Sequence, residues 1–101
     1  MSYRGYLLKM DIAMRARTAR SKIAFDAVHG TWTLGKQVVR TSEADGKVIR
    51  FQLLTVTSAE TLVGSYSGTI GTTPDELAQY LVYFLESGKP WHQGLPNRGL
   101  G

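Results

Sequence analysis

The clearest pattern of apolar and polar positions lies near the C-terminal end of the chain. Apolar side chains recur there with helical spacing and cover about half of the helix circumference. Thr73 and Glu76 form a capping box, and Pro74 suits the first helical position. Gly88 can adopt the left-handed conformation that closes a helix. We therefore expect a helix over residues 74–87.

The apolar face of this helix is wider than one face of a sheet requires. Two interpretations follow. The helix is deeply buried in its own domain, or it packs on its own sheet and also on a partner. Large aromatic side chains are common anchors of protein interfaces. Candidate partner-binding residues are therefore Tyr80, Tyr83, Phe84 and Trp91.

Residues 6–17 show a different pattern, in which apolar and polar side chains alternate. A period of two is typical of a strand with one buried face. A helix is the weaker interpretation, because helical spacing would scatter the charged residues around the cylinder. The apolar face of the predicted strand consists of Leu8, Met10, Ile12 and Met14.

Residues 18–29 fit two structures. As a helix, the segment would be capped by Thr18 and end at Gly30. As a strand, Ile23, Phe25 and Ala27 would share one face. Phe25 and the following residues 28–32 slightly favour the strand, which would give a continuous meander, whereas the helix would give two helices around the sheet.

Several further segments predict extended structure. Asp45-Gly46 favours a hairpin turn that matches the twist of flanking strands. Gly64 and Gly68 lie within the last predicted strand and suggest a bulge or a close backbone contact. The predicted strands cover residues 30–34, 38–42, 48–57 and 62–70.

Together these elements predict an α+β fold. A mainly antiparallel sheet of four or five strands would pack its Leu8/Met10/Ile12/Met14 face against the C-terminal helix at about residues 74–87. Residues 1–90 would form one domain, and residues 91–101 an irregular tail containing Gly and Pro. Open sheet edges and surplus apolar helix surface would both be satisfied by a homodimer.

Composition narrows the class of protein. The 101 residues include no cysteine, which agrees with a reducing compartment. The N-terminal segment lacks the apolar core of a signal peptide, and no apolar run could span a bilayer. We therefore expect a cytoplasmic protein with no membrane partner.

The sequence offers little for catalysis. The two histidines, His29 and His92, lie in a predicted turn and in the predicted tail, without the spacing of metal ligands. No nucleophile elbow and no phosphate-binding glycine loop is present. We therefore expect a non-enzymatic protein with no catalytic residues, no metal and no cofactor.

Positive charge is concentrated in one half of the chain. Residues 1–50 carry ten Lys and Arg against four Asp and Glu, a net charge of +6, whereas residues 51–101 carry −2. Arginine suits phosphate oxygens, and Tyr3 and Tyr6 offer stacking surfaces for unpaired bases. The competing interpretation is a solvated sheet face that protects its edges with charge. The candidate nucleic-acid-binding residues are Lys9, Arg15, Arg17, Arg20 and Lys22.

The favoured function is therefore a small regulatory protein that binds nucleic acid or another polyanion through this N-terminal basic cluster. The alternative is a protein-interaction module, such as a small inhibitor or accessory factor, that uses the wide apolar helix and Trp91.

Overall fold

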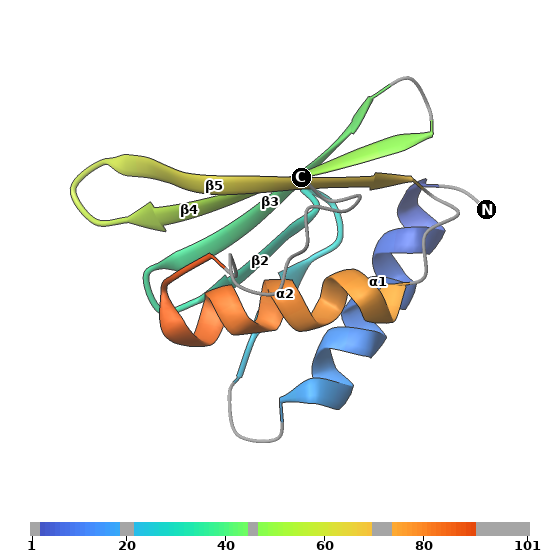
Figure 1. Ribbon diagram of the computed structural model, residues 1–101, viewed down its shortest axis with the longest axis horizontal. Coiled ribbons are helices and arrows are strands. Elements are labelled where there is room, and N and C mark those ends of the chain that lie inside the picture. Colours follow the sequence, from blue (N-terminus) through green and yellow to red (C-terminus); the bar gives the residue numbers. More distant parts are fainter. Residues whose placement is uncertain (1–2, 19–21, 45–46, 70–73, 91–101) are drawn as a thin grey trace.

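The protein is an α+β fold in which five antiparallel strands form a meander and two helices cover one face of the sheet (Figure 1). The computed structural model describes residues 3–18, 22–44, 47–69 and 74–90. The strands lie in chain order across the sheet, from β1 to β5. The elements are α1 (Tyr3–Arg17), β1 (Ala24–Asp26), β2 (Thr31–Leu34), β3 (Gln37–Ala44), β4 (Val48–Val56), β5 (Glu60–Thr69) and α2 (Pro74–Ser87).

The N-terminal segment is a helix, so the predicted strand over residues 6–17 is wrong. Of the predicted strand face, Met10 and Met14 are buried, whereas Leu8 and Ile12 are 49% and 69% exposed. The segment is rich in Ala, Leu, Met, Lys and Arg, which are strong helix formers. The side chains that α1 buries have helical spacing: Tyr6, Leu7, Met10, Ala13 and Met14.

The C-terminal helix is confirmed at residues 74–87. Six of its apolar side chains are buried, from Leu77 to Leu85. Gly88 closes the helix with φ +78°, and its N–H donates to the Phe84 carbonyl at 2.7 Å. Much of the wide apolar face packs against α1, and α2 also contacts β2 and β3. Most of the apolar face of α2 is therefore buried within the domain, and the interpretation that the helix also packs on a partner stays a prediction.

Of the predicted strand over residues 18–29, residues 24–26 form β1, whereas residues 27–30 form a turn. The hairpins after β1 follow the predicted alternation. The inward side of the sheet buries large apolar side chains, among them Trp32, Val39 and Phe51. The β4–β5 register shifts by one residue between Leu53 and Leu54, because β5 contains a bulge at this point. The glycine-rich part of the last strand therefore contains the predicted irregularity.

One hydrophobic cluster unites side chains from both helices and from the inward face of the sheet. Neither of the described helices, α1 and α2, lies on the opposite face of the sheet, as Figure 1 shows. We call it the open face. Several predicted features lie outside the described residues: Arg20, the Asp45-Gly46 turn, Thr73, Trp91 and the rest of the 91–101 tail.

Candidate functional site

Three exposed cations lie around the junction between α1 and β1. Arg15 and Arg17 occupy the last turn of α1, and Lys22 lies two residues before β1. We call Arg15, Arg17 and Lys22 the basic corner. Cations at the carbonyl end of a helix are favoured by its dipole, so the corner also stabilises α1.

Lys9, the remaining described member of the predicted cluster, does not share a face with Arg15. On a strand the two would be on the same side, but on a helix they are about 120° apart. Lys9 is exposed one and a half turns before the corner. The change from strand to helix therefore divides the predicted cluster, and it also separates Arg15 from Arg17, which are about 160° apart around the helix.

Arg15 is held in place by a chain of polar contacts that reaches the core. Its Nε donates to Asp11 Oδ2 at 3.0 Å, and the other carboxylate oxygen accepts a hydrogen bond from Trp32 Nε1 at 3.1 Å. Trp32 is completely buried and stacks on Phe25 with ring centroids 4.8 Å apart. Asp11 thus fixes the Arg15 side chain relative to β2 while it lowers the local positive charge.

The two helices carry opposite charge. Within α1, four cations outnumber one acid and give +3, whereas α2 contains Asp75, Glu76 and Glu86 and no cation, which gives −3. Glu86 lies close to the end of α1, where its Oε2 accepts a hydrogen bond from the Thr18 hydroxyl at 2.7 Å. An anionic ligand at the basic corner would therefore approach from the side away from α2.

A second cation-containing site lies on the open face and was not predicted. Arg50, in β4, is flanked across the sheet by Ser42 and Ser67. These three side chains and their neighbours line a hollow of about 400 Å³. The alternation along β4 places Arg50 and Gln52 on the side away from the core, and the strand order brings the serines beside them. The remaining lining residues are Gln52, Leu62, Ser65 and Tyr66.

Arg40, another cation of the open face, forms an ion pair with Glu60. The Arg40 guanidinium donates two hydrogen bonds to the Glu60 carboxylate, at 2.7 and 3.3 Å. These hydrogen bonds and the arginine charge lower the pKa of Glu60. No comparable ion pair involves Arg50 in the described part of the chain.

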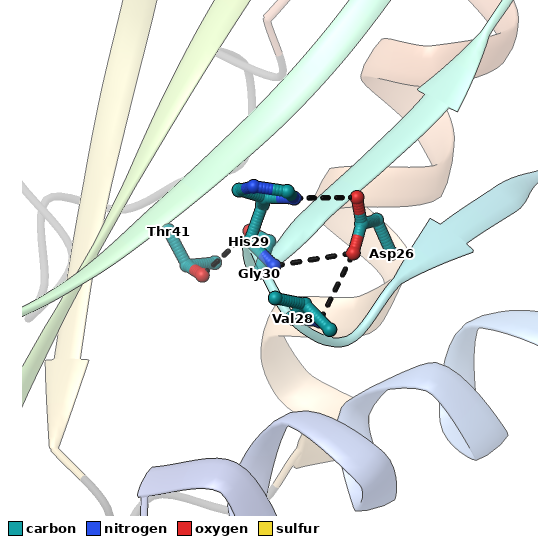
Figure 2. Close-up of polar contacts among 5 residues, drawn as sticks. All are labelled: Asp26, Val28, His29, Gly30 and Thr41. Carbon is teal, nitrogen blue, oxygen red and sulfur yellow. Dashed lines mark hydrogen bonds and ion pairs between the residues drawn. The ribbon is translucent and has the colours of Figure 1, made fainter.

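His29 belongs to a structural turn between β1 and β2. Its Nδ1–H donates to Asp26 Oδ2 at 2.7 Å, while Oδ1 accepts the backbone N–H groups of Val28 and His29 (Figure 2). The histidine side chain is the main cause that holds the pKa of Asp26 below its usual value, followed by the backbone hydrogen bonds. These hydrogen bonds give the side chains of Asp26 and His29 a structural role in the turn.

Gly30 completes the turn for steric reasons. Its φ is +67°, and a Cβ there would lie 2.4 Å from the Thr41 hydroxyl oxygen. That hydroxyl donates to the Gly30 carbonyl at 2.7 Å and accepts a hydrogen bond from Tyr3, which joins α1 to the turn. Figure 2 shows the contact between Gly30 and Thr41.

The predicted aromatic partner surface is reduced by burial. Phe84 is completely buried in the core, so it cannot anchor a partner at the surface. Tyr80 is half-buried and packs on Tyr66 with ring centroids 5.8 Å apart. Tyr83 remains 41% exposed, and Trp91 lies outside the described residues.

Among the described residues, no group of three or more His, Cys, Asp or Glu side chains could hold a metal ion. Neither described helix is long and apolar enough to cross a membrane.

Comparisons with protein-family models, with curated proteins and with solved structures gave no match. The class that the fold and the site define is therefore a small basic α+β protein with two exposed cation-containing surfaces.

Proposed function

We propose that this protein is a non-catalytic nucleic-acid-binding protein that contacts phosphate groups through the basic corner. The observation that carries the proposal is that three exposed cations, Arg15, Arg17 and Lys22, lie within eight residues of the chain where α1 ends and β1 begins. Arginine forks and lysine ammonium groups suit phosphate oxygens. The asymmetric charge of the chain would favour approach of a polyanion to this side.

Arg15 has a particular part in this proposal. Asp11 fixes its Nε, so the terminal guanidinium nitrogens project from a defined position, and the side chain remains 51% exposed. A positioned donor loses less conformational freedom on binding than a mobile one. Contacts of this kind carry no sequence information, so we expect binding with little sequence preference.

The test is fluorescence anisotropy with labelled single-stranded DNA, duplex DNA and RNA across a range of salt concentrations. Replacing Arg17 and Lys22 together by Ala should weaken binding to every ligand that binds. The slope of log affinity against log salt should fall by about 0.7–0.9 for each lost contact. The matched control replaces Lys36 and Lys89 by Ala, which removes the same charge from exposed positions outside the corner.

Wild-type affinity and slope in the Arg17/Lys22 variant would reject the proposal. Equal loss in both double variants would also reject it, since net charge alone would then explain binding.

A second candidate rests on a different observation. Leu8 and Ile12 are adjacent on the outer side of α1 and are 49% and 69% exposed. Arg4 and Arg15 lie beside them on one side and Lys9 on the other. Nucleic-acid binding does not explain why two aliphatic side chains are exposed. A protein partner whose contact surface has an apolar centre and an acidic rim would match this part of α1.

This candidate predicts a different result. Replacing Leu8 and Ile12 by Ser should abolish capture of a cross-linked protein partner and leave nucleic-acid binding unchanged. Tyr83→Ser, which alters the exposed face of α2, is the control. Retained capture by the Leu8/Ile12 variant would reject the candidate.

A further inference from the structure

Strand β5 forms one edge of the sheet. It pairs with β4, and no other strand of the described residues lies on its outer side. The strand is ten residues long, whereas β1 at the opposite edge has three. A long edge strand is a template on which another strand can pair.

The second half of β5 lacks the usual devices that prevent such pairing. The strand contains no Lys, Arg or Pro. Its one charged residue, Glu60, is at its beginning and is held by Arg40 of β3. The bulge opposite Leu53 and Leu54 affects the first half alone, so the second half, from Gly64 to Thr69, is in regular register with β4.

The regular half of β5 reads the same in both directions about Tyr66. The five residues Gly64-Ser65-Tyr66-Ser67-Gly68 form a palindrome. Two antiparallel copies of a palindromic strand that meet at its centre place like residues opposite one another across a two-fold axis. Such self-complementarity is what a symmetric dimer interface requires.

We propose that a second copy of this chain pairs antiparallel with β5, about a two-fold axis at Tyr66. In this register Ser65 lies opposite the partner's Ser67, and Gly64 lies opposite the partner's Gly68. The two sheets then form one continuous ten-stranded sheet. This assembly does not depend on the proposed nucleic-acid binding.

The side chains on both faces suit this pairing. On the open face the strand presents Ser65 and Ser67, which are small, uncharged and exposed. On the inward face, Tyr66, which is 6% exposed and packs on Tyr80, lies opposite the partner's Tyr66 at the axis. The Arg50 hollows of the two copies then lie on either side of the axis, on one surface.

Disulfide trapping tests the register directly, because the chain has no cysteine of its own. Two single variants, Ser65→Cys and Ser67→Cys, are purified, mixed and oxidised. We expect a disulfide-linked dimer in the mixture and much less in either variant alone, since position 65 faces position 67 across the axis. The control mixes Ser42→Cys with Ser67→Cys, because Ser42 is an exposed serine of the same face on the interior strand β3.

Sedimentation of the wild-type chain provides the second measurement. We expect a concentration-dependent rise from the 11.2 kDa monomer toward twice that mass. A monomer at every concentration would overturn the proposal. So would a dimer in which Ser65→Cys and Ser67→Cys form no more disulfide than the Ser42 control, because the interface would then lie elsewhere. Cross-linking by Ser65→Cys alone would overturn the register.

Discussion

Tyr3 and Tyr6 both belong to α1, but their hydroxyl groups differ in hydrogen bonding. The hydroxyl of Tyr3 bonds Thr41 at 2.8 Å, whereas the hydroxyl of Tyr6, a residue 1% exposed, makes no hydrogen bond in the described structure. Burial, with a smaller contribution from the charge of Glu76, raises the pKa of Tyr6 to about 12. A buried hydroxyl without a partner destabilises the folded state, because its hydration is lost without replacement.

The same substitution should therefore have opposite effects at these two positions. Tyr6→Phe should raise the free energy of unfolding by about 1 kcal/mol, and Tyr3→Phe should lower it by about 1 kcal/mol. Urea unfolding followed by circular dichroism measures both. Destabilisation by Tyr6→Phe would show that its hydroxyl has a partner.

The pH dependence gives an independent check on Tyr6. Its pKa is about 12 in the folded state, above the usual value of 10.0. Between these two pH values the unfolded state releases the proton while the folded state retains it, so stability falls as pH rises through this window. Tyr6→Phe should show a shallower decline there than the wild type, and equal declines would contradict the assignment.

At the scale of the element, α1 shows how a periodic pattern can mislead. The set Leu8, Met10, Ile12 and Met14 alternates perfectly, yet the neighbouring Tyr6, Leu7 and Ala13 are apolar too. Both periods are therefore present in the same segment. The helix buries the second set together with the two methionines, since those side chains join one core cluster with α2 and the inward face of the sheet.

Truncation of Met10 and Ile12 distinguishes the helix from the predicted strand. Met10→Ala should lower the free energy of unfolding by about 2–5 kcal/mol, because Met10 is 0% exposed. Ile12→Ala should change it by less than about 0.5 kcal/mol, since the Ile12 side chain is 69% exposed. A strand with both residues on its buried face would instead lose comparable stability in the two variants.

At the scale of the whole molecule, the two helices carry opposite net charge, and the open face of the sheet presents polar side chains. Cations predominate on α1 and acids on α2, so the helical side of the molecule has a basic and an acidic part. Arg50 provides positive charge on the opposite face. The net charge of +4 therefore understates the local positive potential beside α1.

Removing the negative charge of Asp11 should strengthen polyanion binding. Asp11→Asn retains an oxygen that can accept the Trp32 hydrogen bond but removes the charge beside Arg15. We expect a few-fold gain in affinity for nucleic acid and a steeper salt dependence in the anisotropy assay. Asp75→Asn is the control, because it makes the same charge change at the start of α2. An equal gain in both variants would contradict a local role for the basic corner.

The sequence by itself determined the C-terminal helix, the hairpins and the fold class. These elements have local signals: Gly88 closes α2, and the alternation around Phe51 describes a strand with one buried face. Such signals depend on neighbours within a few residues, so they can be interpreted without knowledge of the fold.

Only the tertiary structure decided the state of residues 3–17 and the arrangement of the candidate surfaces. The periodicity of α1 fits two structures, and packing against α2 selected the helix, which separated Lys9 from Arg15 and buried Phe84 beneath the surface. The Arg50 hollow joins three strands that are apart in sequence. Which side chains meet across a sheet depends on strand order and register, and these are set by the packing of the whole core rather than by any local pattern.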